Sequence, residues 1–527
     1  MIVAFDLETV WSKNYSVAKI GIDRYVKHPD FRVTLVSIVA EDEFEWVGEP
    51  QRLPVERLNG HTLISHNAEF DSVCARAAIF RGQMPEFMPS DWICTADMAS
   101  YHQLPRSLAG AIKELFNEEI SKDERDAMAG LSAQEIQANP AFINYALEDS
   151  RNCLRVYQEL NVGFPEKERL LSSLTRRIAN RGLAINGPLC QQFIDKMEKI
   201  LEDTDRKTTE WRQANLALQT YQKLIMGQRF DRRVPTRLKY CGAPHTKRWS
   251  GGGVINFQAI PNDAVVDTSA RKCLQAPQGR VIVSADLSQI EPRVIAYLVG
   301  DQNFLGLVRG GIDIYEAHGR ASKLYNEDEP MAELAPEMRK LCKARLLGLG
   351  YGCGANTFLE VAKSFGVTMT EAEAKKQVLL YRAQNPDVHL AWSKIEDQFR
   401  EWMKETPECI TFTTRCGVPV RYFNAYEENG NLFASTTRGY APVKIYGARL
   451  FQNLVQATAR SIFADALIRI EAAGLPICLH VHDSVTLEVA ENEGQAALNL
   501  LTQLLTEEPL SYPGLPLAAE GEIKTHY

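Results

Sequence analysis

The stretch VIVSADLSQIEPRVIAYL, residues 281–298, decides how the second half of the chain folds. Its first residues are apolar and largely β-branched, which predicts a buried strand, and the residues after it fit a helix. Asp286 stands where the strand ends, so its carboxylate is expected to be rigidly held yet open to solvent. Because a single aspartate at a strand end is more often a cap or turn residue, other residues must support any catalytic interpretation.

A second carboxylate lies about 200 residues further along, in PICLHVHDSVTLEV, residues 476–489. Apolar and β-branched residues flank the HDS triplet, which predicts a β-hairpin with His482 and Asp483 at its tip. We expect the two elements to bring Asp286 and Asp483 together. Phosphoryl transfer needs such a pair, because two divalent ions ~3.5–4 Å apart stabilise both the attacking and the leaving oxygen. Hard oxygen ligands indicate Mg²⁺.

The segment MRKLCKARLLGLGYGCG, residues 338–354, carries Arg339, Lys343, Leu347 and Tyr351 at steps of four. This spacing predicts one slowly drifting helix face. Two cations a turn apart can grip a triphosphate, with Lys343 protonating the departing pyrophosphate and Arg339 holding its charge. Tyr351 offers an aromatic face to a base pair. Without its companion motifs, an amphipathic helix with an ordinary basic face would explain this segment equally well.

Acidic residues near the N-terminus form a second candidate site. The opening strand ends in Asp6, Leu7 and Glu8, and period-two alternation points both acids to the same side. Asp71 follows in HNAEFD, and YALED contains Asp149 four residues after Tyr145. Four carboxylates predict a two-metal site at which water attacks a phosphate, with Tyr145 orienting that water. A lone DxE pattern is weak, whereas the ordered set is specific.

Composition limits the class of protein. A chain of 527 residues exceeds one hydrophobic core, so we expect three or four domains. With 45% hydrophobic and 24% charged residues, and no uninterrupted apolar run of about 18 residues, we expect no membrane segment. The N-terminus lacks the pattern of a signal peptide, and the eleven cysteines form no CxxC pair. These features favour a protein of the reducing cytoplasm.

Charge is unevenly distributed. The 59 basic and 67 acidic residues give a net charge of −8, which argues against nucleic-acid binding by bulk charge. Residues 223–248 nevertheless combine eight basic residues with one acid, Asp231. This segment could follow a phosphate backbone, and a solvated surface loop explains it about as well. The basic residues are Lys223, Arg229, Arg232, Arg233, Arg237, Lys239, Lys247 and Arg248.

Three segments together resemble a known family. DLSQIEPR (residues 286–293), RxxxKxxxLxxxYG (339–352) and VHDS (481–484) are similar, in order and separation, to the three polymerase motifs of family A, typified by bacterial DNA polymerase I. The N-terminal set DxE, NxxxD and YxxxD resembles the DEDDy class of 3′–5′ exonucleases, the proofreading domain of that family. The resemblance covers nearly the whole chain.

The resemblance implies a multidomain fold that mixes α/β and α+β parts. An RNase H-like exonuclease domain would occupy residues 1–160, followed by a right-hand polymerase. Its thumb would span 165–235, its palm 236–300 and 415–527, and its fingers 300–415. Asp6 lies so near the start that no 5′ nuclease domain is expected, a compactness that resembles phage replicative enzymes.

Roles for individual residues follow from the same resemblance. Asp286, Asp483 and the backbone carbonyl of Leu287 would bind both magnesium ions of the polymerase site. Glu291 would be the steric gate against a ribose 2′-hydroxyl, since burying an unpaired hydroxyl is unfavourable. Gln289 would join Arg339, Lys343, Leu347 and Tyr351 in binding the nucleotide. Residues expected to contact primer, template or the new base pair are Arg248, Asn256, Gln258, Arg271, Gln456 and His482.

The implied function is template-directed DNA synthesis with proofreading. A wrong base pair differs from a right one by only a few kcal/mol, so a second check by the exonuclease would add to the selectivity of the polymerase. Its partners would be primer–template DNA and dNTPs, with no membrane. Two Mg²⁺ ions are expected at each site, with Mn²⁺ as an alternative. We expect a monomeric, replicative enzyme of the cytoplasm, and the sequence does not indicate a processivity partner.

Two departures from the family pattern leave alternatives open. Ser484 replaces the usual glutamate of HDE, and Leu347 replaces an aromatic residue. HDS is the pattern of single-subunit phage RNA polymerases, so an RNA polymerase is the second interpretation, against which Glu291 argues. An exonuclease with an inactive polymerase body is the third, and the intact Asp286, Lys343 and Asp483 disfavour it.

Overall fold

The structure, a computed structural model, describes residues 1–229, 231–260 and 269–527. Part of the predicted palm, residues 261–268, lies outside the described residues. The chain divides into two compact units. The first comprises Met1–Ser284, Glu471–Leu498 and Glu522–Tyr527, and the second comprises Ala285–Ile470 and Asn499–Gly521.

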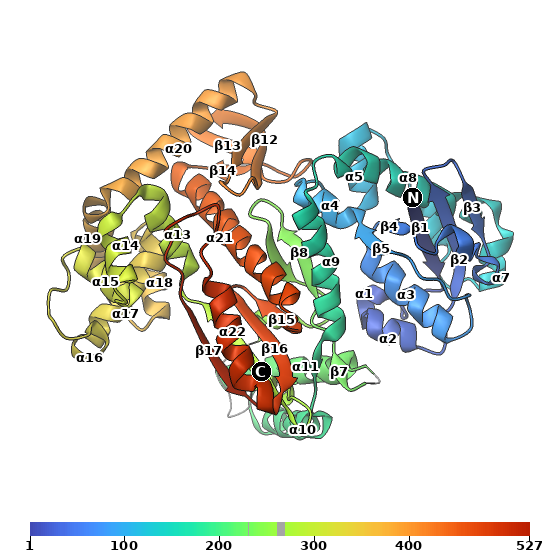
Figure 1. The fold of residues 1–527 in the computed structure, drawn as a ribbon, viewed down its shortest axis with the longest axis horizontal. Coiled ribbons are helices and arrows are strands. Elements are labelled where there is room, and N and C mark those ends of the chain that lie inside the picture. The colour runs from blue at the N-terminus through green and yellow to red at the C-terminus, as the bar shows by residue number, and fades with distance from the viewer. Residues whose placement is uncertain (230, 261–268) are drawn as a thin grey trace. The chain divides into compact units, whose positions relative to one another are not determined.

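A five-stranded sheet organises the N-terminal part of the first unit (Figure 1, blue). Its strand order is β3-β2-β1-β4-β5, in which β1 runs antiparallel to β2 and parallel to β4. All eight residues of β2 are buried, as expected for its largely apolar sequence VTLVSIVA, and its two polar residues, Thr34 and Ser37, are buried with the rest. The strands are β1 (Ile2–Thr9), β2 (Val33–Ala40), β3 (Glu45–Gly48), β4 (Thr62–Ser65) and β5 (Asp91–Cys94).

Helices pack against this sheet, with α8 contacting β1 and β2 and α3 contacting β1 and β5. Pro140 occupies the first turn of α8, where its missing N–H removes no helical hydrogen bond. The helices are α1 (Val17–Ile20), α2 (Ile22–Lys27), α3 (Ala68–Phe80), α4 (Thr95–Tyr101), α5 (Leu108–Phe116), α6 (Asp123–Ala127), α7 (Ala133–Ala138) and α8 (Pro140–Asn161). The α/β pattern predicted for residues 1–160 is therefore confirmed.

Long helices follow, as the charged, glycine-poor sequence predicts. The turn GLAINGP separates α9 from α10, and Gly182 at φ 60° ends α9 beside the carbonyl of Val234, where a Cβ would come within 2.4 Å of that oxygen. The elements are α9 (Glu166–Arg181), α10 (Gly187–Asp203), α11 (Thr209–Gly227), the paired strands β6 (Leu183–Ala184) and β7 (Arg233–Val234), and the hairpin β8 (Leu238–Ala243) and β9 (Arg248–Gly251).

A four-stranded sheet has the order β15-β16-β10-β17. The predicted hairpin is confirmed: Val481 pairs with Ser484, and His482 at φ 54° lies in the tight turn between them. The border between the two units falls within β10, after Ser284. The strands are β15 (Ile477–Val481), β16 (Ser484–Ala490), β10 (Arg280–Leu287) and β17 (Ala519–Lys524).

The second unit is mainly helical. Its helices include α13 (Ile290–Val299), α14 (Gln302–Arg309), α15 (Ile314–Ala321), α16 (Met331–Leu334), α17 (Pro336–Ala344), α18 (Ala355–Ser364), α19 (Glu371–Gln384) and α20 (Pro386–Glu405). The sequence interpretation missed a sheet of β11 (Cys409–Thr413), β12 (Pro419–Glu428), β13 (Asn431–Ser435) and β14 (Val443–Ile445). The long helix α21 (Gly447–Ala472) and α22 (Gly494–Thr506) cross the border between the units.

Two properties of the described chain bear on its class. All eleven cysteines are free thiols. Among the described residues, no helix combines the length and apolarity that a membrane crossing requires.

Candidate functional site

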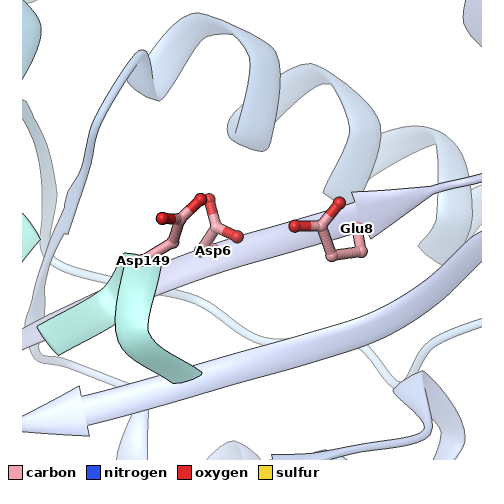
Figure 2. Close-up of side chains that lie close together, drawn as sticks. All are labelled: Asp6, Glu8 and Asp149. Atoms are coloured by element: carbon pink, nitrogen blue, oxygen red, sulfur yellow. The ribbon is translucent and has the colours of Figure 1, made fainter. Parts of the chain in front are cut away.

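Three carboxylates from two elements converge in the first unit (Figure 2). Asp6 and Glu8 project from β1, and Asp149 projects from α8. One oxygen of each lies within 4.8 Å of the others. The alternation predicted for Asp6 and Glu8 is correct, because residues two apart on a strand share a face.

The electrostatics of this cluster are those of like charges held together. Burial, followed by the charge of Asp149, raises the pKa of Asp6 to about 8. Burial also raises the pKa of Glu8 well above its ordinary value, with Asp6 and Asp149 adding to the effect. The pKa of Asp149 rises to about 6, chiefly through burial. Each group would regain its charge beside a cation.

Asp71 on α3 belongs to the same group. Its side chain is 1% exposed, and its pKa is raised well above the ordinary value by burial and then by the charge of Asp6. Its buried Oδ1 accepts no hydrogen bond from the described residues. A buried oxygen without a donor is costly unless something else satisfies it. Four carboxylates with such an oxygen fit the hard-ligand chemistry of Mg²⁺ or Mn²⁺.

Tyr145 lies one turn before Asp149 on α8 and hydrogen-bonds its carboxylate. Burial, followed by the charge of Asp149, raises the pKa of Tyr145 well above its ordinary value, so the phenol stays protonated and can donate. Arg125 on α6 favours the charged forms of Glu8 and Asp149. The sequence interpretation missed Arg125, because no local pattern links residue 125 to this site.

Asp286 forms the second candidate site, with other residues of the second unit. Its side chain is exposed, yet partial desolvation, followed by the charge of Glu520, raises its pKa to about 6. Glu520 belongs to β17, the neighbour of β10, and Ser288 N donates to the carbonyl of Ala518 at 2.8 Å. The sequence interpretation missed Glu520, since its proximity arises from strand pairing over more than two hundred residues.

The predicted gate residue is held by an aromatic partner. Tyr351 donates its hydroxyl hydrogen bond to Glu291, which lies in the first turn of α13. Gln289 precedes that helix with a left-handed backbone, at φ 47°. Leu287, whose carbonyl was predicted as a metal ligand, ends β10 and is buried. The second unit thus brings together Gln289, Glu291 and Tyr351.

The two predicted triphosphate cations share one aromatic ring. The guanidinium carbon of Arg339 lies 5.0 Å from the ring centre of Tyr315, and Nζ of Lys343 lies 5.8 Å from it. Arg339 also forms an ion pair with Asp313, 2.9 Å between Nη2 and Oδ2. Such contacts hold both cations on the same side of their helix.

The prediction of one continuous α-helix through Tyr351 is wrong. The α-helix α17 ends at Ala344, and Arg345–Leu349 form a π-helical turn, η4. Tyr351 lies in the turn that follows. In an α-helix, steps of four drift in one direction, whereas a π-turn holds more residues and reverses that drift. Leu347, one of the two departures from the family pattern, lies in this turn and is 36% exposed to solvent.

Arg345, which the sequence interpretation missed, anchors the π-turn. It is 0% exposed, and Nε donates to Nε2 of His318 at 3.2 Å. Its terminal nitrogens donate to Oε1 of Gln377 and of Gln384, each at 2.6 Å. Burial, followed by the charge of Arg345, lowers the pKa of His318 to about 3, so the imidazole accepts as a neutral ring. All three acceptors belong to α15 and α19.

The remaining predicted residues are distributed over both units. In the first unit, Asp483 follows His482 in the hairpin turn. Asn256 accepts from the backbone N of Gln258 at 3.1 Å, and Arg271 donates to the carbonyl of Ile260 at 3.0 Å. Arg248 begins β9. Gln456 is a half-buried residue of α21 in the second unit.

Comparisons with known proteins support these motifs. Residues 188–527 match the family model described as DNA polymerase family A. The DNA polymerase of Bacillus phage SP02 is 23% identical over 658 aligned positions, covering 100% of this chain and 99% of that protein. The thermostable DNA polymerase I of Thermus filiformis is 30% identical over 264 positions, which cover 49% of this chain and 28% of that protein.

A solved structure shares the fold. The POL domain of Pol1 from M. smegmatis, in complex with DNA primer-template and dNTP, superposes with a TM-score of 0.69 at 17% identity. The match covers 99% of this chain and 95% of that one. The multidomain architecture of mixed helices and sheets is therefore shown for the whole chain.

Proposed function

The chain belongs to DNA polymerase family A, and on that premise we propose that it extends a DNA primer with dNTPs and trims mispaired 3′ ends at a separate site. The observation that carries the first activity is the family match over residues 188–527, which contains all three polymerase motifs. The observation that carries the second is the cluster of Asp6, Glu8 and Asp149 beside buried Asp71.

At the polymerase site, Asp286 and Asp483 would hold two divalent cations with the carbonyl of Leu287. The family match over residues 188–527, which contains both aspartates, supports this pairing. The bound cations would supply charge stabilisation to the attacking and leaving oxygens. Ser484, which begins β16, offers a hydroxyl where the family usually has a carboxylate, so the two aspartates would carry the ligand charge.

Residues of the second unit would bind the incoming nucleotide. Arg339 and Lys343 would hold the triphosphate, and Lys343 would give its proton to the departing pyrophosphate. The bond between Tyr351 and Glu291 fixes the carboxylate proposed to exclude a ribose 2′-hydroxyl. The face of Tyr351 would then pack against the new base pair.

At the exonuclease site, the four carboxylates would hold two divalent cations, Mg²⁺ or Mn²⁺. These would supply an activated water and stabilise the departing 3′-oxygen. Tyr145, protonated and directed at Asp149, would orient the water. A protein with both sites can act as a replicative enzyme, and the full-length match to the Bacillus phage SP02 polymerase supports that proposal.

Primer extension with Asp286→Asn and Asp6→Ala variants tests both assignments. We expect Asp286→Asn to lose extension and keep trimming, and Asp6→Ala to do the reverse. Extension that survives Asp286→Asn would sink the polymerase mechanism, and undiminished trimming by Asp6→Ala would remove the exonuclease. Efficient use of rNTPs by the unaltered protein would favour an RNA polymerase, against the family match. Light scattering of the purified protein tests the proposed monomer.

A further inference from the structure

The edge strand β17 runs antiparallel to β10, its neighbour in the sheet. Directly after β10, the N–H of Ser288 donates at 2.8 Å to the carbonyl of Ala518, which directly precedes β17. The end of one strand therefore adjoins the start of the other, as in an antiparallel pair. Near the opposite ends, Gln275 before β10 forms an antiparallel bridge with His526 after β17.

This register places Glu520 directly opposite Asp286, and both residues belong to the second unit. Asp286 lies two residues before Ser288, and Glu520 lies two residues after Ala518. Residues opposite each other in an antiparallel pair point to the same face, with Cβ atoms about 4.5–5.5 Å apart. Both side chains are exposed. Burial, followed by the charge of Glu520, raises the pKa of Asp286, which agrees with this proximity.

The fold does not compensate the charge of this acidic pair. Neither carboxylate forms an ion pair or a hydrogen bond with a described residue. By contrast Glu522, two residues further along β17, forms an ion pair with Lys524, 2.5 Å between Oε1 and Nζ. Like charges directly opposite each other in a sheet are destabilising. Two exposed carboxylates left in this state fit a hard divalent cation, whose charge would offset both.

Glu520 also lies within electrostatic reach of a residue proposed to hold the triphosphate. A hydrogen bond with Asp313 raises the pKa of Arg339, and the charge of Glu520 adds to this shift. The ion pair of Arg339 is nevertheless formed with Asp313. The carboxylate of Glu520 is thus close to a proposed metal ligand, Asp286, and close to a proposed phosphate-binding cation. A divalent cation that bridges protein and phosphate oxygens requires such a position.

We propose that Glu520 is a third acidic residue of the polymerase metal site, where its carboxylate helps to bind the divalent cation held by Asp286. The inference rests on the proposed polymerase function and extends it to a residue outside the three family motifs. It also offers a reason why Ser484 is tolerated in place of the usual glutamate, since Glu520 supplies a carboxylate from another strand. Carboxylates that support a metal site typically contribute about 10–100-fold to metal affinity.

Binding of Mn²⁺ to the full-length protein, followed by the electron paramagnetic resonance signal of the free ion, tests the proposal. All proteins carry Asp6→Ala/Glu8→Ala, so that the proposed exonuclease site adds little to the binding. Glu520→Gln should raise Kd for Mn²⁺ roughly tenfold. The matched control is Glu522→Gln, which removes an acid from the same strand and should leave Kd within about twofold.

Thermal unfolding separates a cation-binding role from a structural one. In EDTA, Glu520→Gln removes one of two like charges, so its melting temperature should equal or exceed that of the background protein. At a Mn²⁺ concentration near the Kd of the background protein, the same variant should gain less in melting temperature than the background does. A variant that melts lower in EDTA and binds Mn²⁺ as tightly as the background would make Glu520 structural and overturn the proposal.

Primer extension gives the functional readout. The Mg²⁺ concentration that supports half of the maximal rate should rise roughly tenfold for Glu520→Gln. A changed KM for dNTPs with an unchanged Kd for Mn²⁺ would overturn the proposal and assign Glu520 to Arg339 instead.

Asp286→Asn in the same background separates this inference from the proposed function. Weaker Mn²⁺ binding by Asp286→Asn, with unchanged binding by Glu520→Gln, would overturn the role of Glu520 and leave the polymerase site in place. Unchanged Mn²⁺ binding by both variants would overturn the proposed metal site at Asp286 together with the inference built on it.

Discussion

The two candidate sites differ in how far the fold removes their carboxylates from water. Asp71 of the proposed exonuclease site is 1% exposed and the pKa of Asp6 rises to about 8, whereas Asp286 is exposed and its pKa rises only to about 6. Four carboxylates converge in the first site from β1, α3 and α8. Burial of this kind suits the single strand proposed as the substrate of the first site, and exposure suits the duplex proposed as the substrate of the second.

The two sites also differ in the charges that surround them. Carboxylates repel one another at the first site, and the charges of Arg125 and, beside Asp149, of Lys122 oppose this repulsion. At the second site, cations already lie in position on α17, held by Tyr315 and Asp313. A phosphate at the first site would therefore need bound metal ions to offset the acids, whereas a phosphate at the second site would meet cations that the fold already holds.

The largest expected effects come from separating the two activities. Asp286→Asn should lower the rate of primer extension by roughly a thousandfold or more, since it removes a charged ligand from the proposed metal site. Trimming of single strands should stay within about twofold of the unaltered protein. Single-turnover extension and trimming assays measure both. Equal loss of both activities would break the distinction between the sites.

The second effect is on stability. The pKa of Asp6 is higher in the folded protein than its ordinary 3.8, so the folded state binds the proton more tightly. The stability that protonated Asp6 contributes to the folded state is fully present below about pH 4 and is lost as the pH rises to about 8. Asp6→Asn should therefore raise the free energy of unfolding of metal-free protein at pH 8 by a few kcal/mol, on the order of one per pKa unit.

Thermal unfolding in EDTA at pH 5 and pH 8 measures this contribution. The control is Asp286→Asn. This variant should also raise the free energy of unfolding, but its effect should reach its full size by about pH 6, because the pKa of Asp286 rises only to about 6. If Asp6→Asn stabilises the protein no more at pH 8 than at pH 5, the conclusion that the folded protein raises the pKa of Asp6 is wrong.

The third effect concerns the π-turn. Arg345→Met leaves His318, Gln377 and Gln384 without their buried donor, a loss of about 1–3 kcal/mol for each unmade bond. We expect KM for dNTPs to rise roughly tenfold because Leu347 and Tyr351 lose their fixed position. Arg345→Lys, which keeps the charge and some donors, should raise KM for dNTPs less than Arg345→Met does. Steady-state extension at varied dNTP concentration measures it, and a loss of stability with unchanged KM would make Arg345 purely structural.

The smallest expected effect concerns the hydrogen bond that Tyr351 donates to Glu291, the proposed gate residue. Tyr351→Phe removes the hydrogen bond to Glu291 and keeps the ring, at a net cost of about 1 kcal/mol. The preference for dNTPs over rNTPs should then fall several-fold, roughly fivefold. Competition between dATP and rATP on one template measures the ratio. An unchanged ratio would show that the carboxylate of Glu291 is held without Tyr351.

Local patterns predicted most elements that carry the candidate residues. Alternation in MIVAFDLETV placed Asp6 and Glu8 on one face, and β-branched residues around HDS predicted the hairpin. These predictions worked because side-chain direction and turn chemistry depend on neighbouring residues. The helix through Tyr351 failed for the opposite reason: the π-turn is held by acceptors on α15 and α19, which no local spacing reveals.

By itself, the sequence determined the family and the identity of the proposed catalytic residues, because ordered motifs record chemistry that must be present whatever the packing. Only the tertiary structure decided how these residues are held: which acids are buried, that Glu520 lies beside Asp286, and that Arg345 anchors the π-turn. Solvation and charge–charge distance set these properties, and both depend on residues brought together from distant parts of the chain.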